Sequence, residues 1–98
     1  MGASGTTSVD FGAFPGKSDT SVAVTGQTSI LSGSLVEAWI FPTATADHSA
    51  DEHLVETLKV IAGNVVAGTG FTIYALNTAQ VNNETRLYGL WTVAWVWN

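Results

Sequence analysis

The densest group of side chains that could carry out chemistry lies between Asp47 and Glu56. It holds His48, His53 and four carboxylates within ten residues. Imidazole and carboxylate groups together can bind zinc or a similar ion. His48 and His53 are five residues apart, however, and this spacing places them on opposite faces of a strand and out of line on a helix. The group also contains no oriented pair of nucleophile and base. We therefore expect a solvated loop with no metal, no cofactor and no enzymatic activity, with metal binding and a pH-sensitive contact as the alternatives.

A second motif, Gly12-Ala-Phe-Pro-Gly16-Lys17-Ser18, looks like a phosphate-binding loop. The true motif has four residues between its glycines, whereas this one has three. It must also open a helix, so that backbone N–H groups converge on the phosphate. Residues 19–24 alternate in polarity like a strand instead, so we expect no nucleotide site.

The chain is short and carries little charge. Its 98 residues predict one domain with one modest core. Charged residues make up 11% of it, well below the roughly 25% of an ordinary soluble domain, which indicates a surface partly hidden by partners. The chain has no cysteine, so disulfides and thiolate metal sites are excluded.

The charge balance is acidic, with a net charge of −5 and three scattered cations, Lys17, Lys59 and Arg86. Three scattered cations cannot form a basic patch, so we expect no binding to nucleic acid and none to an anionic membrane. Glu37, between apolar neighbours, is expected to face solvent or to pair with Lys59 or Arg86 across strands. No stretch approaches the roughly 18 consecutive apolar residues of a membrane span, and the first residues lack the pattern of a secretory signal. We therefore expect a protein that is made in the cytoplasm.

Alternating polarity predicts strands over residues 20–25, 35–41, 71–76 and 86–97, with polar loops at 43–53 and 77–85. Residues 1–19 are rich in small side chains and are expected to form an extended N-terminal arm, with residues 20–98 as the domain. The pattern predicts an all-β fold, a small antiparallel β-sandwich of about six strands.

The segment between residues 54 and 62 is ambiguous. Ser49 and Glu52 have the spacing of a capping box, which would begin a helix over residues 49–55. We favour a strand over residues 54–62, because Thr, Val and Ile dominate its second half, and we expect Gly63-Asn64 to end it.

The closing strand is the strongest apolar signal in the chain. On an extended strand, Trp91, Val93, Trp95 and Trp97 share one face, while Leu90, Ala94 and Val96 share the other. A strand that is apolar on both faces is usually covered on both faces. One small core covers a single face, so we expect a second copy of the chain to cover the other. The side chains expected to carry folding and assembly are Phe11, Phe14, Trp39, Phe71, Trp91, Trp95 and Trp97.

Two segments resemble a known family. Residues 59–74 combine a strand, a short turn, a Gly-Phe pair and an alternating strand, and residues 88–97 form an aromatic-aliphatic closing strand. Both are similar to the second half of the H-type lectin domain. The resemblance implies a six-stranded antiparallel sandwich that forms parallel trimers and binds sugars between protomers. It assigns no ligand-binding residue here, and the loops at 43–53 and 77–85 are the expected places for one.

Small sandwiches of this kind also occur in tailed-phage particles, as head decoration proteins and in tail-fibre tips. The absence of cysteine, the low charge and the Gly/Ala/Thr/Val-rich composition are similar to those of phage virion proteins. We therefore expect a structural virion protein of a tailed bacteriophage, a homo-oligomer (a trimer by the resemblance) that contacts other virion proteins and acts by burial of apolar surface. The alternative is a lectin-like module that binds carbohydrate on the host.

Overall fold

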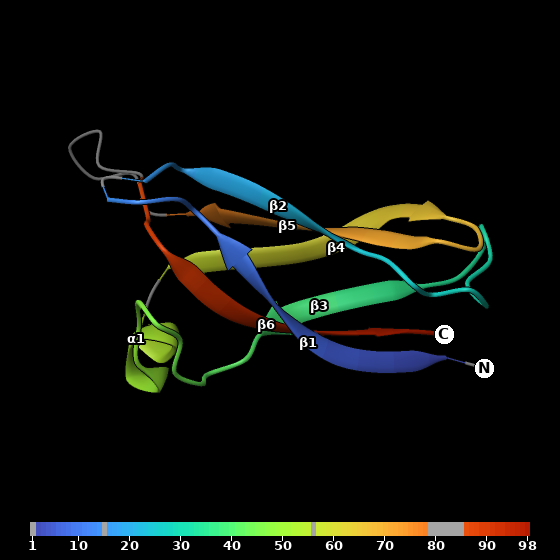
Figure 1. Ribbon diagram of the computed structural model, residues 1–98, viewed down its shortest axis with the longest axis horizontal. Helices are drawn as coiled ribbons and strands as arrows, with labels where there is room; N and C mark the ends of the chain where they lie inside the picture. Colours follow the sequence, from blue (N-terminus) through green and yellow to red (C-terminus); the bar gives the residue numbers. More distant parts are fainter. Residues whose placement is uncertain (1, 15, 56, 79–85) are drawn as a thin grey trace.

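The computed structural model describes residues 2–14, 16–55, 57–78 and 86–98. Within these residues the elements are β1 (Ala3–Asp10), β2 (Asp19–Val24), β3 (Val36–Ile40), α1 (Ala50–Val55), β4 (Leu58–Val66), β5 (Gly70–Asn77) and β6 (Leu90–Trp97). The strands form two antiparallel three-stranded sheets, ordered β1-β6-β3 and β2-β5-β4. Figure 1 shows the two sheets as layers, with α1 at one end and both chain termini at the other. The predicted all-β antiparallel fold is confirmed.

The core lies between the central strands of the two sheets. The side chains that alternate along β6 to the inner face, Trp91, Val93, Trp95 and Trp97, are all buried, as the pattern predicted. Phe71 of β5 meets the Trp95 ring edge-on, with centroids 5.5 Å apart. Each buried indole removes about 150–250 Å² from water, which makes β6 the largest single apolar contribution to the fold.

The N-terminal segment is a strand of the sandwich instead of an arm outside it. β1 pairs with β6 along its whole length, from Ala3 opposite Trp97 to Asp10 opposite Leu90. The indoles of β6 leave room only for small side chains on β1. A Cβ on Gly5, for example, would lie 2.7 Å from the Trp95 ring. The sandwich therefore begins at residue 3, and the expected boundary at residue 20 is wrong.

The ambiguous segment contains both of the structures considered for it. The capping box is formed: the Ser49 N–H donates to Glu52 Oε1 at 2.7 Å, and the Glu52 N–H donates to Ser49 Oγ at 3.3 Å. These bonds satisfy N–H groups that a helix start leaves unpaired, so α1 forms. The favoured strand accordingly begins at Leu58, four residues later than residue 54. The strand also continues past Gly63-Asn64 to Val66. Its register with β5 shifts between Gly63 and Val66, where Asn64 has a φ of 51°, and the pairing resumes at Val66.

No helix in the described parts of the chain is long and apolar enough to cross a membrane.

Candidate functional site

The middle of the outward face of β6 is covered within a single chain. Thr92 and Ala94 point away from the core, yet they are only 9% and 6% exposed. Both are small, and the cross-strand neighbours of Ala94 are Thr6 on β1 and Trp39 on β3. Thr92 and Ala94 are therefore covered without a second copy, whereas Leu90 and Val96 on the same face are only partly buried. Cover by a second copy stays a prediction for this part of the face.

The exposed apolar surface of this sheet lies on β3 and its two ends instead. Alternation puts Leu35, Glu37, Trp39 and Phe41 on the outer side. Leu35 is 79% exposed, Trp39 44% and Phe41 43%. We call these four residues, together with Val96 beside Glu37 on β6, the first outer face. It presents three large apolar side chains around one carboxylate.

The other sheet carries a comparable surface. Ile61 of β4 is 52% exposed, and Tyr74 and Leu76 of β5 are 41% and 37% exposed. Ile61 lies opposite Tyr74 in the ladder, and Lys59 lies opposite Leu76. We call Lys59, Ile61, Tyr74 and Leu76 the second outer face. It presents three large apolar side chains beside one ammonium group.

The seven predicted assembly and core residues fall into two groups. The larger group is buried and consists of Phe11, Phe71, Trp91, Trp95 and Trp97. Phe14 and Trp39 are on the surface, and Phe14 is 78% exposed. Sequence reasoning missed Leu35 and Phe41 as surface contacts, although their two-residue spacing from Glu37 and Trp39 was a usable signal. It missed Ile61, Tyr74 and Leu76 because nothing local says which face of β4 and β5 meets the core.

The two histidines are buried structural groups instead of members of a solvated loop. His53 Nε2 accepts the Thr92 N–H at 2.9 Å, and Nδ1, which must then carry the proton, donates to the Ser49 carbonyl at 2.8 Å. The bond to Thr92 holds α1 against β6, and the bond to Ser49 fixes the orientation of the imidazole at the start of the helix. His48 stacks on Trp91 with centroids 3.8 Å apart, and its Nε2 donates to the Tyr88 carbonyl at 2.6 Å.

Both ring nitrogens of each histidine are thus engaged. His48 Nδ1 lies 3.1 Å from Glu52 Oε2. The Ser49 backbone hydrogen bond, and next the His48 side chain, lower the pKa of Glu52 below its usual 4.5. The described residues contain no group of three or more His, Asp or Glu side chains that could hold a metal ion.

The segment that looked like a phosphate loop has another role. The Lys17 N–H donates to the Leu87 carbonyl at 3.0 Å and its carbonyl accepts the Leu87 N–H at 2.9 Å, so this segment is tied to the one before β6. It leads into β2 and not into a helix, so the geometry that would gather N–H groups around a phosphate is missing.

A hollow of about 450 Å³ lies where β1 ends and β6 begins. Phe14, one of its lining residues, is 78% exposed and meets the Tyr88 ring edge-on with centroids 5.5 Å apart. Two carboxylates also line it: Asp10 accepts the Gly12 N–H and Asp47 accepts the Leu90 N–H, each at 2.8 Å. Asp47 comes from the expected ligand loop at 43–53. Residues 79–85 of the other expected loop lie outside the described residues.

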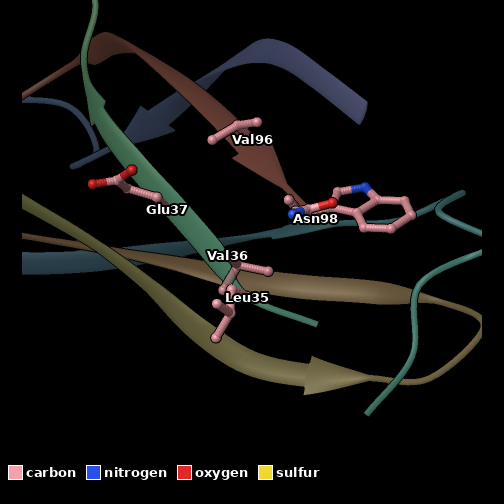
Figure 2. A pocket seen from close by; sticks show the side chains of 6 residues that line it. Leu35, Val36, Glu37, Val96 and Asn98 are labelled. Atoms are coloured by element: carbon pink, nitrogen blue, oxygen red, sulfur yellow. The ribbon is translucent and has the colours of Figure 1, made fainter. Parts of the chain in front are cut away.

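A second hollow of about 310 Å³ lies at the end of the first outer face. Figure 2 shows Leu35, Val36 and Glu37 lining it from the β3 side, and Val96 and Asn98 from the β6 side. The Leu35 and Asn98 backbones bond to each other here, N–H to carbonyl in both directions at 3.1 and 3.0 Å. Glu37 therefore lines a hollow between two strands that are joined at this end by backbone hydrogen bonds.

Comparison with protein-family models, with curated proteins and with solved structures found no match to this chain. The resemblance to the H-type lectin domain therefore stays a prediction. The exposed outer faces and the two hollows are the features that bear on function.

Proposed function

We propose that this chain is a structural building block of a tailed-bacteriophage particle, a head decoration or tail-fibre component whose copies assemble by burying apolar surface. The observation that carries the proposal is the pair of outer faces. Each face presents three large, partly exposed apolar side chains, which are Leu35, Trp39 and Phe41 on one and Ile61, Tyr74 and Leu76 on the other. Contiguous exposed apolar patches of this kind mark interaction sites.

The magnitudes favour whole-face contacts over contacts of single side chains. Burying a half-exposed Leu, Ile or Phe side chain contributes about 1 kcal/mol at about 25 cal/mol per Å². Association costs roughly 4–15 kcal/mol in lost freedom of motion. One side chain cannot offset that cost, so a stable assembly must bury most of a face at once. The low content of charged residues, 11%, supports the same reading because it leaves few charges to desolvate.

The assembly that we propose is a homotrimer, the state that the likeness to H-type lectins implies, fixed to other proteins of the particle. It has no catalytic activity in this proposal, since the histidines are committed to structural hydrogen bonds. The location in a virion rests on composition and on the small-sandwich architecture.

Sedimentation velocity and light scattering on the purified chain from 5 to 200 µM test the self-association. We expect an oligomer across this range, and a monomer at 200 µM would overturn the proposal. Mass spectrometry of purified phage particles from the genome that encodes the chain tests the location. Several copies per particle are expected, and consistent absence from the particles would count against a virion role.

The hollow between β1 and β6 favours a second candidate function, carbohydrate binding. An exposed aromatic ring can stack on the apolar face of a sugar, and carboxylates accept hydrogen bonds from its hydroxyls. Phe14 and Tyr88 offer rings here, and Asp10 and Asp47 offer carboxylates. A glycan array with the purified chain is the test, with Phe14→Ala as the loss-of-binding variant. Leu54→Ala is the matched control, because Leu54 is 73% exposed and does not line this hollow.

A further inference from the structure

We propose that copies of this chain join head to tail, with the first outer face of one copy packed on the second outer face of the next, and that Glu37 and Lys59 pair across this contact. The inference rests on the proposed self-association and names the surfaces that carry it. Its partner is a second copy of the same chain.

The two charges lack partners within the described chain. Glu37 and Lys59 are both exposed, and the one ion pair among the described residues joins His48 to Glu52. The expected cross-strand pairing of Glu37 with Lys59 or Arg86 within one chain is therefore not formed. Glu37 is on the outer side of one sheet and Lys59 on the outer side of the other, so a single copy cannot bring them together.

Each charge lies among apolar side chains that the contact would bury. Glu37 has Leu35 and Trp39 two residues away on the same face and Val96 as its cross-strand neighbour. Lys59 has Ile61 two residues away and Leu76 as its cross-strand neighbour. Covering either apolar surface would take the charge out of water as well. An unpaired buried charge costs several kcal/mol, so each face needs a partner that supplies the opposite charge.

Only one of the two faces can supply a cation. Lys59 is the single basic residue on the outward positions of the six strands. Packing two first outer faces together would bury two copies of Glu37 with no cation. Packing two second outer faces together would offer Lys59 only the Asp19 carboxylate of the other copy. Asp19 is on β2, beside Leu76 and on the side of Leu76 away from Lys59. Packing the first outer face of one copy on the second outer face of the next pairs Glu37 with Lys59.

The contact requires the two copies to be offset along the strands. Glu37 is opposite Val96, near the end of the sandwich that holds both termini, whereas Lys59 follows α1 at the start of β4, near the other end (Figure 1). β3 and β4 are edge strands on the same side of the sandwich, so a copy that keeps its orientation and is shifted along the strand direction brings its β3 over the start of the other copy's β4. A contact between two different faces is heterologous, and it produces a closed ring or an open filament depending on the rotation between copies.

Charge reversal tests the contact. The dissociation constant for self-association is measured by sedimentation velocity for the wild type, Glu37→Lys, Lys59→Glu and the double variant. We expect each single reversal to weaken association at least tenfold, and the double variant to recover to within about threefold of the wild type, since roughly 1.4 kcal/mol corresponds to a factor of ten. Lys17→Glu makes the same charge change as Lys59→Glu at an exposed residue that belongs to neither outer face, and should leave association unchanged. Thermal melts followed by circular dichroism check that every variant is folded.

The outcomes separate this inference from the proposed function. A wild type that stays monomeric overturns both. A wild type that associates while the two reversals do nothing, or while the double variant fails to recover, overturns the head-to-tail contact alone. An association that is insensitive to Glu37→Lys but lost with Asp19→Lys would show that two second outer faces meet, and it would also overturn the head-to-tail contact.

Discussion

His53 on α1 accepts a hydrogen bond from the backbone N–H of Thr92 on β6, with 2.9 Å between Nε2 and N. The two residues are 39 positions apart in the chain. The bond occupies a buried N–H on the edge of β6 that faces β3, at the point where the pairing with β3 ends, and it requires Nδ1 of the imidazole to carry a proton. This single contact anchors the helix that covers one end of the sheet.

Replacing this histidine should destabilise the fold strongly. His53→Ala leaves the buried Thr92 N–H without an acceptor, which costs about 1–3 kcal/mol, and it removes a side chain that is 2% exposed. We expect a loss of about 2–4 kcal/mol in urea unfolding. Leu54→Ala, on the exposed side of the same helix, is the control and should stay within about 0.5 kcal/mol of the wild type. Equal stabilities for the two variants would contradict the role of His53.

The small residue at position 5 should be needed for the packing of the neighbouring indole. In Gly5→Ala the new Cβ would lie 2.7 Å from the Trp95 ring, so the ring must shift. Overpacking of this kind costs about 1–3 kcal/mol, and we expect that loss in urea unfolding, together with a change in tryptophan fluorescence. The control is Gly33→Ala, where a Cβ meets nothing within 4 Å. A Gly5→Ala protein as stable as Gly33→Ala would show that β1 is not packed against Trp95.

Substituting two tryptophans one at a time should separate the effects on assembly from the effects on folding. Trp95 is 8% exposed in the core, whereas Trp39 is 44% exposed on the first outer face. Trp95→Ala should lower the free energy of unfolding by about 3–5 kcal/mol. Trp39→Ala should change it by less than about 1 kcal/mol, yet weaken self-association in sedimentation velocity. Trp39→Ala protein that associates like the wild type would argue that the first outer face takes no part in assembly.

The free energy of unfolding should fall in acid because a carboxylate at the start of α1, that of Glu52, becomes protonated. The hydrogen bonds from Ser49 and His48 lower the pKa of Glu52 below its usual 4.5. A carboxyl whose folded pKa is depressed stabilises the fold above its unfolded pKa and loses that contribution as the pH falls through the folded value. We therefore expect urea-unfolding stability to drop below about pH 4.5, and Glu52→Gln to make that drop shallower. Asp51→Asn, next to it on α1, is the control and should keep the wild-type slope.

The sequence by itself determined the elements whose signals are local. Alternation along β6 identified Trp91, Trp95 and Trp97 as one face, and that face is the core. The Ser49–Glu52 spacing identified a helix start, and the paired hydrogen bonds confirm it. Period-two patterns and capping boxes are set by neighbours a few residues away, so they can be seen before the fold is known.

Only the tertiary structure decided what depends on residues far apart in the chain. β1 looked like an arm because its side chains are small, and it is a strand because Gly5 lies against Trp95, ninety residues away. His48 and His53 looked solvated, and they are buried because Trp91 and Thr92 lie beneath them. The outward position of Trp39 likewise follows from which side of β3 meets the core. Burial is a property of the packed layers, so the surfaces available to a partner emerged only when both sheets were in place.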